Sequence, residues 1–129
     1  MRTWQLVTFV VSCFIYAISC QDEVIKFHGE IPNCHANLNE EVMFEGIVFT
    51  MLKNNGKALE FQLDLSICDS EDTCQHQSVK VDIGAMTSMM RSKSIYLIKT
   101  YTTPGERTLT LTSTINKMVE ETMCTFNVK

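Results

Sequence analysis

The side chains that most often carry catalysis are few in this chain and lie far apart. Its three histidines are His28, His35 and His76, and none is beside a plausible nucleophile. The chain has no Gly-x-Ser-x-Gly elbow, His-Glu-x-x-His pair or glycine-rich phosphate loop. Its acidic pairs, Glu40-Glu41 and Glu120-Glu121, lie in polar stretches typical of solvated charges. We therefore expect a protein that is not an enzyme and holds no cofactor.

A metal site is the second chemical possibility, because Cys68 and Cys74 lie close to His76. Thiolate and imidazole are the ligands that zinc prefers, but five residues between the cysteines is the wrong spacing for a zinc knuckle. No second pair of ligands completes the set. We expect no metal, and the two cysteines are first of all disulfide partners.

An unusual apolar cluster lies in residues 84–93. It contains Met86, Met89 and Met90, followed by Arg91 and Lys93. Methionine is flexible and suits a surface that must adapt to variable apolar shapes, while the cations would pair with a carboxylate or phosphate head. One interpretation is the mouth of a pocket for an amphiphile. The other is ordinary core packing, or a helical turn lying against a sheet.

The segments that must position these side chains alternate between apolar and polar residues. Residues 59–67 are apolar at every second position, which predicts a strand with one buried face. Residues 42–50 are apolar on both faces, as expected of a central strand of a sandwich. Other strands are expected near residues 24–27, 79–83, 94–101, 108–112 and 124–128. About seven short strands predict an all-β fold, an immunoglobulin-like antiparallel sandwich of two sheets.

Turn residues lie between the expected strands. Asn55-Gly56 within residues 53–57 favours a tight hairpin, and Pro104-Gly105 favours a type II turn. Residues 116–121 read as a polar link before the last strand. Residues 84–93 are expected to form a mobile loop or one short helical turn.

The first 19 residues have the pattern of an export signal. Arg2 supplies the positive start, a mostly apolar run follows, and Ala17-Ile18-Ser19 supplies the small residues at a cleavage site. Cleavage after Ser19 leaves 110 of the 129 residues, one domain over residues 20–129. Cleavage one residue later, after Cys20, is the alternative. We expect a secreted, extracellular protein; the endosomal or lysosomal lumen is also compatible with export.

Charge limits the partners. Without Arg2 the chain has 10 Lys and Arg against 15 Asp and Glu, a net charge of −5. Nucleic acid and anionic membrane surfaces both need a basic field, so neither is an expected partner. No second apolar run approaches the ~18 residues that span a bilayer, so no stable membrane insertion is expected either.

Three parts of the chain contain cysteines at characteristic places. The stretch from Cys20 ends in Ile31-Pro32-Asn33-Cys34, Cys68 and Cys74 are separated by five residues, and residues 105–109 and 120–128 have an acidic turn before Cys124. Together they resemble the ML family of secreted lipid-recognition domains, which includes the Niemann–Pick type C sterol carrier and the group two mite allergens. The first stretch looks like the opening strand of that family, and residues 105–109 and 120–128 look like its closing hairpin. The resemblance covers nearly the whole chain after the signal.

This resemblance implies disulfides between Cys20 and Cys124 and between Cys68 and Cys74. Cys34 is then a free thiol if cleavage follows Ser19, and it becomes the partner of Cys124 if cleavage follows Cys20. The resemblance also implies a sterol, fatty acid or other acyl lipid in an apolar cavity between the sheets. The expected ligand-binding residues are Phe44, Phe61, Leu63, Leu65, Met86, Met89, Met90, Arg91, Lys93, Leu97, Leu109 and Phe126.

The alternative function belongs to a different class. A filled immunoglobulin-like sandwich would have no lipid ligand and would act as a secreted modulator of another protein, such as a receptor. Loops at residues 53–57 and 84–93 would then make the contacts, as loops on rigid β scaffolds commonly do. A packed core and a lined cavity use the same residue types, so the sequence leaves both functions open.

Overall fold

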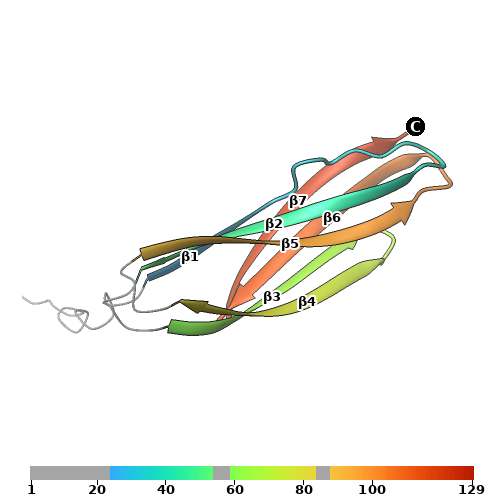
Figure 1. Cartoon of the computed structure of the whole chain (residues 1–129). Coiled ribbons are helices and arrows are strands. Elements are labelled where there is room, and N and C mark those ends of the chain that lie inside the picture. Colours follow the sequence, from blue (N-terminus) through green and yellow to red (C-terminus); the bar gives the residue numbers. More distant parts are fainter. Residues whose placement is uncertain (1–23, 54–58, 84–87) are drawn as a thin grey trace, which may run out of the picture.

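Seven strands make up the regular structure of the described part of this chain (Figure 1). The computed structural model describes residues 24–53, 59–83 and 88–129, and this part of the chain contains no helix. The strands are β1 (Val24–Glu30), β2 (Glu41–Lys53), β3 (Leu59–Asp69), β4 (Cys74–Ile83), β5 (Ser88–Thr100), β6 (Gly105–Ile115) and β7 (Met118–Val128). All neighbouring strands pair antiparallel. The predicted all-β class is confirmed.

The strands form two sheets packed as a sandwich, as predicted. One sheet has three strands in the order β1-β2-β5, and the other has four in the order β4-β3-β6-β7. Strand β4 pairs with β3 and not with β5, so the hairpin β3–β4 stays within one sheet. Both layers can be followed in Figure 1.

The inward faces of the two sheets form one apolar core. In β3 the predicted alternation is present, because Phe61, Leu63, Leu65 and Ile67 are all buried. Three aromatic rings form the centre of one end of this core. The ring of Phe44 lies 5.4 Å from that of Phe126 and 6.4 Å from that of Tyr101, centroid to centroid.

The sheets approach each other closely at Gly46 in β2. A Cβ atom at this position would lie 2.7 Å from Cδ1 of Leu111 in β6, which is closer than real Cβ contacts. The side chain of Leu111 therefore occupies the space that the missing Cβ leaves. Any larger residue at this buried point of β2 would force the side chain of Leu111 to move, because the sheets pack tightly there.

Two disulfides lie in the described part of the sandwich. Cys68 bonds Cys74 as predicted. Cys124 bonds Cys34, so the expected pairing with Cys20 is wrong and the alternative pairing, given for cleavage after Cys20, is confirmed. The reason is the path of the chain after β1. Residues 31–40 pass beside β7 (Figure 1), and the amide of Leu38 donates to the carbonyl of Lys129 at 3.1 Å, so Cys34 lies against Cys124.

Two segments expected outside strands belong to them. Residues 88–93 are part of β5, so the loop or helical turn predicted for 84–93 is wrong there; 84–87 lie outside the described residues. Residues 118–121 belong to β7, and the expected polar link shrinks to a turn at Asn116 and Lys117, which have φ of 48° and 70°. Positive φ at both central residues matches the twist of a tight hairpin. The expected hairpin turn at 53–57 lies largely outside the described residues.

Candidate functional site

The apolar side chains expected to bind a ligand lie together between the sheets. These are Phe44, Phe61, Leu63, Leu65, Leu97, Leu109 and Phe126, and all are buried. They belong to a single cluster of buried side chains and pack against one another. The residues expected to line a cavity thus form the apolar core between the two sheets.

Met90 and the cations expected beside it at a pocket mouth lie on opposite faces of β5. Met90 points to the outer face of the three-stranded sheet, and Arg91, the next residue of the strand, points to the opposite face. Arg91 and Lys93 line a separate surface groove of about 230 Å³ with Lys80, Val81 and Asp82 of β4. Met89 is in β5 in register with Leu52, and Met86 lies outside the described residues. The predicted mouth is therefore wrong in grouping Met90 with Arg91 and Lys93.

The outer face of the sheet β1-β2-β5 is the most unusual surface of the molecule. We call it the three-stranded outer face. It is formed by Lys26, His28 and Glu30 of β1, Glu41, Met43, Glu45, Ile47, Phe49 and Met51 of β2, and Met90, Ser92, Ser94, Tyr96 and Ile98 of β5. Five large apolar side chains on it are widely exposed: Met43 60%, Met51 49%, Met90 65%, Tyr96 47% and Ile98 58%.

The outer face of the four-stranded sheet, by contrast, is typical of a surface in contact with water. Its outward positions are mostly polar, with four threonines at alternate positions of β6: Thr108, Thr110, Thr112 and Thr114. Exposed apolar side chains on this face occur at its β7 edge, at Val119 and Met123. The polar–apolar alternation normal for a half-buried sheet is thus present in one sheet and missing from the other.

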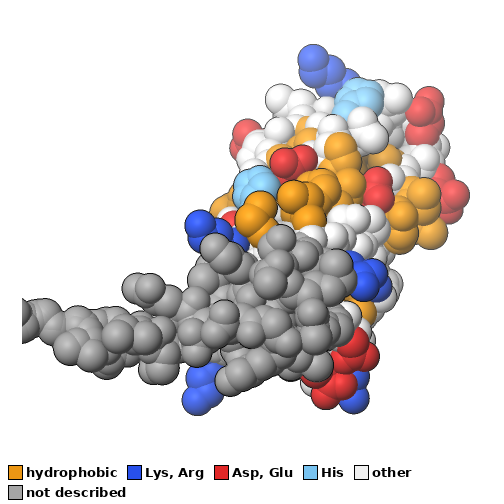
Figure 2. Space-filling model, turned by 60° about the vertical axis from the view of Figure 1, so that its left-hand side comes forward, with side chains coloured by type: hydrophobic (Ala, Val, Ile, Leu, Met, Phe, Trp, Pro, Cys, Tyr) orange, Lys and Arg blue, Asp and Glu red, His pale blue; other side chains and the backbone are white. Residues whose placement is uncertain are grey.

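A shallow groove of about 170 Å³ lies at one end of the three-stranded outer face. It is lined by Lys26, Phe27, His28, Phe49, Thr50, Met51 and Met90. At its border, His28 lies 3.5 Å from a carboxylate oxygen of Glu30 and 3.6 Å from one of Glu120. Figure 2 shows hydrophobic side chains at the surface beside histidine and charged side chains. The groove is apolar with a charged border.

The middle and far end of this face carry acidic side chains. Ser94 donates to the carboxylate of Glu45 at 2.8 Å, and the hydroxyl of Tyr96 donates to the same oxygen at 3.3 Å. Beyond them, Met43 lies opposite Ile98 across the two strands. Apolar side chains thus occur at both ends of the face, with basic groups near one end and acidic groups near the other.

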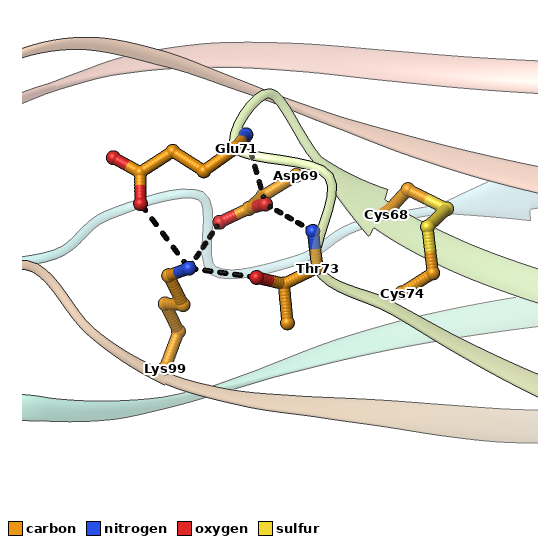
Figure 3. Close-up of a disulfide and its surroundings, with 6 residues drawn as sticks. All are labelled: Cys68, Asp69, Glu71, Thr73, Cys74 and Lys99. Carbon is orange, nitrogen blue, oxygen red and sulfur yellow. Dashed lines mark hydrogen bonds and ion pairs between the residues drawn. A yellow bond between two sulfur atoms is a disulfide. The ribbon is translucent and has the colours of Figure 1, made fainter.

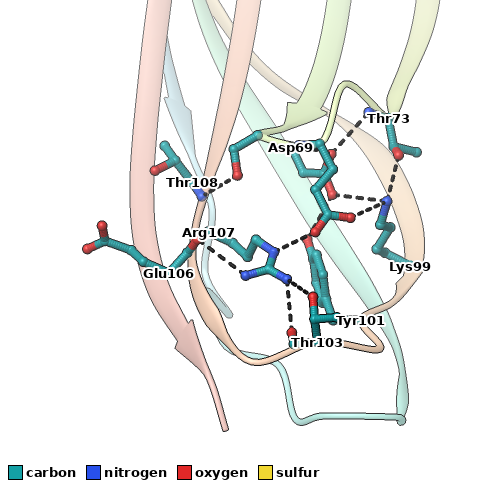
Figure 4. A network of polar contacts seen from close by, with 10 residues as sticks. Asp69, Thr73, Lys99, Tyr101, Thr103, Glu106, Arg107 and Thr108 are labelled. Carbon is teal, nitrogen blue, oxygen red and sulfur yellow. Dashed lines mark hydrogen bonds and ion pairs between the residues drawn. The ribbon is translucent and has the colours of Figure 1, made fainter.

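A buried polar network stabilises the end of the sandwich that lies opposite this groove (Figures 3 and 4). The carboxylate of Asp69 accepts hydrogen bonds at 3.0 Å from the amides of Glu71 and Thr73 and from the hydroxyl of Tyr101. The ammonium of Lys99 lies 3.5 Å from the same carboxylate. This buried carboxylate has partners at both oxygens, so it fixes the β3–β4 turn and does not offer a binding group.

The outer part of this network is an ion cluster around Glu71. Lys99 lies 3.1 Å from one carboxylate oxygen of Glu71, and Nε of Arg107 donates to the other at 2.7 Å. Lys99 first, then Arg107, lower the pKa of Glu71 below its ordinary value of 4.5. Burial, followed by the nearby Asp69, raises the pKa of Tyr101 above its ordinary value of 10.0. The network joins β3, β5 and β6 at one corner.

A serine, a histidine and an aspartate line a depression on the outer face of β3 and β4, but not as a catalytic triad. They are Ser78, His76 and Asp64, and the Ser78 hydroxyl donates directly to Asp64 at 2.6 Å. A nucleophilic serine would instead pass its proton to the histidine. Within residues 24–53, 59–83 and 88–129, no cluster of three or more His, Cys, Asp or Glu could hold a metal ion. Nor does this part of the chain contain a helix able to cross a membrane.

The sequence contains a pattern that corresponds to the three-stranded outer face, but the same pattern also fits a strand buried on both sides. Residues 42–50 are apolar on both faces, which predicted burial on both sides. In the structure, β2 is central within its sheet, yet its odd-numbered side chains face outward and Met43 and Met51 are exposed. Apolar residues on both faces of a strand indicate either a covering layer or an interaction surface.

The sequence matches no protein-family model and no curated protein. Several solved structures match at low similarity. A β-glucosidase from Erythrobacter marinus matches with a TM-score of 0.46 and 13% identity over 81% of this chain and 16% of that one. The CARDB domain of the PF1109 protein from Pyrococcus furiosus, in complex with di-metal ions, matches with a TM-score of 0.43 and 16% identity over 84% of this chain and 89% of that domain. The DNA glycosylase AlkC from Pseudomonas fluorescens matches with a TM-score of 0.43 and 14% identity, over 81% of this chain and 30% of its own.

Proposed function

We propose that this protein is a secreted, non-catalytic immunoglobulin-like module that binds another protein through the three-stranded outer face. The observation that carries this proposal is the exposure of Met43, Met51, Met90, Tyr96 and Ile98 on one side of one sheet. Monomeric soluble proteins rarely expose large contiguous apolar patches, and those that do commonly use them for binding. Methionine and tyrosine are also enriched in protein interfaces.

The packing of the core supports a protein partner over an internal lipid. The rings of Phe44, Tyr101 and Phe126 contact one another, and Leu111 fills the space beside Gly46. The groove on the outer face has a volume of about 170 Å³. Pockets for drug-sized ligands typically have ~300–1,000 Å³, so the groove fits a side chain of a partner better than a sterol.

Export fits the two disulfides of the described chain. Cys34–Cys124 and Cys68–Cys74 require an oxidising compartment, as found outside the cell. The expected signal at residues 1–19 would deliver the chain there. A disulfide-bonded sandwich with a filled core is a rigid scaffold, which favours binding because little conformational entropy is lost on association.

A face-specific binding assay tests this function. The mature protein is displayed as a soluble multimer and tested against cells that each express one extracellular domain, with the chain itself included in the panel. Met43→Glu with Ile98→Glu places charges on the three-stranded outer face without touching the core. We expect this double variant to lose binding, because an unpaired charge buried in an interface is costly.

The matched control is Val119→Glu with Met123→Glu, on the outer face of the other sheet. These two side chains are as exposed as the pair on the three-stranded outer face, at 62% and 63%. We expect the control to bind like the unaltered protein, and both double variants to keep its melting temperature. Binding that survives in the Met43/Ile98 variant, or an unaltered protein that binds no member of the panel, would contradict the proposal.

A further inference from the structure

We infer that the protein bound at the three-stranded outer face is a second copy of this chain, an inference that rests on the proposed function. Homodimers usually have two-fold symmetry, so the same surface of both copies must be complementary to itself. A face with this property has matching groups at equal distances on either side of one point. The three-stranded outer face has this arrangement.

The point of symmetry is the cross-strand pair formed by Ile47 of β2 and Ser94 of β5. Met43 and Met51 lie four residues before and after Ile47. Met90 and Ile98 lie four residues before and after Ser94, and they are the cross-strand partners of Met51 and Met43. Because a strand rises ~3.4 Å per residue, each exposed apolar pair lies about 14 Å from the centre.

We place a two-fold axis at this central pair, in the plane of the interface and perpendicular to the strands. Each strand then lies over the same strand of the second copy and runs in the opposite direction. Met51 of one copy then faces Met43 of the other, and Met90 faces Ile98. Ile47 faces itself. All of the widely exposed methionines of this face thus meet apolar partners, with Tyr96 between the two apolar pairs.

The charges on the face fit the same rotation. Lys26 and His28 lie on the half that contains Met51, whereas Glu41 and Glu45 lie on the half that contains Met43. The rotation places the half of one copy that contains Lys26 and His28, with Glu120 at its border, over the half of the other copy that contains Glu41 and Glu45. Opposite charges on facing halves favour this register of the interface. Glu30 lies in the central row, in register with Ile47, and its carboxylate is 3.5 Å from the imidazole of His28.

Sedimentation equilibrium of the mature protein between about 1 and about 100 μM tests the inference, a range that covers micromolar dissociation constants. We expect a reversible dimer. Met43→Lys and Met51→Glu should each weaken the dimer by about tenfold or more, because each introduced charge faces a methionine of the partner. Both residues are exposed in the single chain, so the melting temperature of each variant should stay that of the unaltered protein.

Mixing the two variants provides the sharpest result. In a mixed dimer the introduced ammonium faces the introduced carboxylate, and the remaining two methionines face each other. The mixture should therefore associate more tightly than either variant alone. Met123→Lys, on the other sheet, is the matched control and should dimerise normally.

Three results would overturn the inference: a monomer over the whole range, a dimer that neither charge variant weakens, or a mixture that associates no better than its components. These results leave the proposed function open to a separate test. If the unaltered protein is a monomer but Met43→Glu with Ile98→Glu abolishes its binding to a different extracellular protein, the second copy is excluded and the proposed function stands. If neither self-association nor any other binding depends on this face, both are wrong.

Discussion

The hydroxyl of Tyr101 donates to the buried carboxylate of Asp69 at 3.0 Å, and this hydrogen bond joins the end of β5 in one sheet to the end of β3 in the other. Side chains link the two layers here: this hydrogen bond, and the contacts of Lys99 and Arg107 with Glu71 (Figure 4). The amides of Leu38 and Asn39 add backbone hydrogen bonds to the carbonyls of Lys129 and Tyr101. The network leaves the three-stranded outer face uninvolved, so fold and binding surface can be tested separately.

Replacing Tyr101 by Phe should destabilise the protein by about 1–3 kcal/mol, because one oxygen of a buried carboxylate loses its hydrogen-bond donor. Urea unfolding measures the change. Tyr96→Phe is the matched control, since the Tyr96 hydroxyl also donates to a carboxylate, that of Glu45, but at the exposed surface. Its effect should stay within about 0.5 kcal/mol. Equal losses in the two variants would contradict a structural role for the Asp69 network.

Protonation of Glu71 should lower the free energy of unfolding in acid. The pKa of Glu71 is lowered in the folded protein from its ordinary value of 4.5 by Lys99 and Arg107. Its contribution is therefore present above pH 4.5 and lost as the pH falls from that value towards the folded pKa. The free energy of unfolding, measured from about pH 6 to about pH 3, should fall less steeply in Glu71→Gln than in the unaltered protein. Parallel curves would show that the ion cluster is not coupled to folding.

The two disulfides should differ in their contribution to stability. Cys34 and Cys124 are 90 residues apart in the sequence, and Cys68 and Cys74 are six apart. By the chain-entropy model, replacing the first pair by serine should cost about 4–5 kcal/mol and replacing the second about 2 kcal/mol. Urea unfolding of the two double variants measures this order. A non-reduced peptide map should join Cys34 to Cys124, and a peptide joining Cys20 to Cys124 would contradict the structure.

Gly46→Ala should destabilise the protein, because the added methyl group meets Leu111 in a filled core. Overpacking of this kind typically costs about 1–3 kcal/mol. Leu111→Val shortens the obstructing side chain, so the double variant should lose less stability than the sum of the two single changes. Additive losses, measured by urea unfolding, would mean that the two sites are not in contact.

The fold could be predicted where apolar side chains face the core and polar side chains alternate with them on the outer face of a strand. Residues 59–67 bury one face and expose polar side chains on the other, so both the strand and its buried residues were predictable. The beginning of β5 was not, because Met90 lies on the outward face while Arg91 and Lys93 lie on the other. This inverted placement removes the pattern by which a strand is recognised.

Spacing alone could not decide the contacts between distant parts of the chain. The sequence left both Cys20 and Cys34 open as partners of Cys124, and the choice depends on the path of residues 31–40 beside β7, which no local pattern encodes. The same holds for Asp69 and Tyr101, which are separated by 32 residues. The three-stranded outer face was hidden for a different reason: its apolar residues also suit a buried strand, and the sequence does not show which faces another layer covers.

Native mass spectrometry of the secreted protein, purified without detergent, tests most directly whether the space between the sheets holds side chains or a ligand. The filled core around Phe44, Leu111 and Phe126 predicts the mass of the mature chain with its disulfides and no bound lipid. The spectrum should be unchanged after extraction with organic solvent. A sterol or acyl lipid bound in stoichiometric amount, and removed by that extraction, would contradict the account.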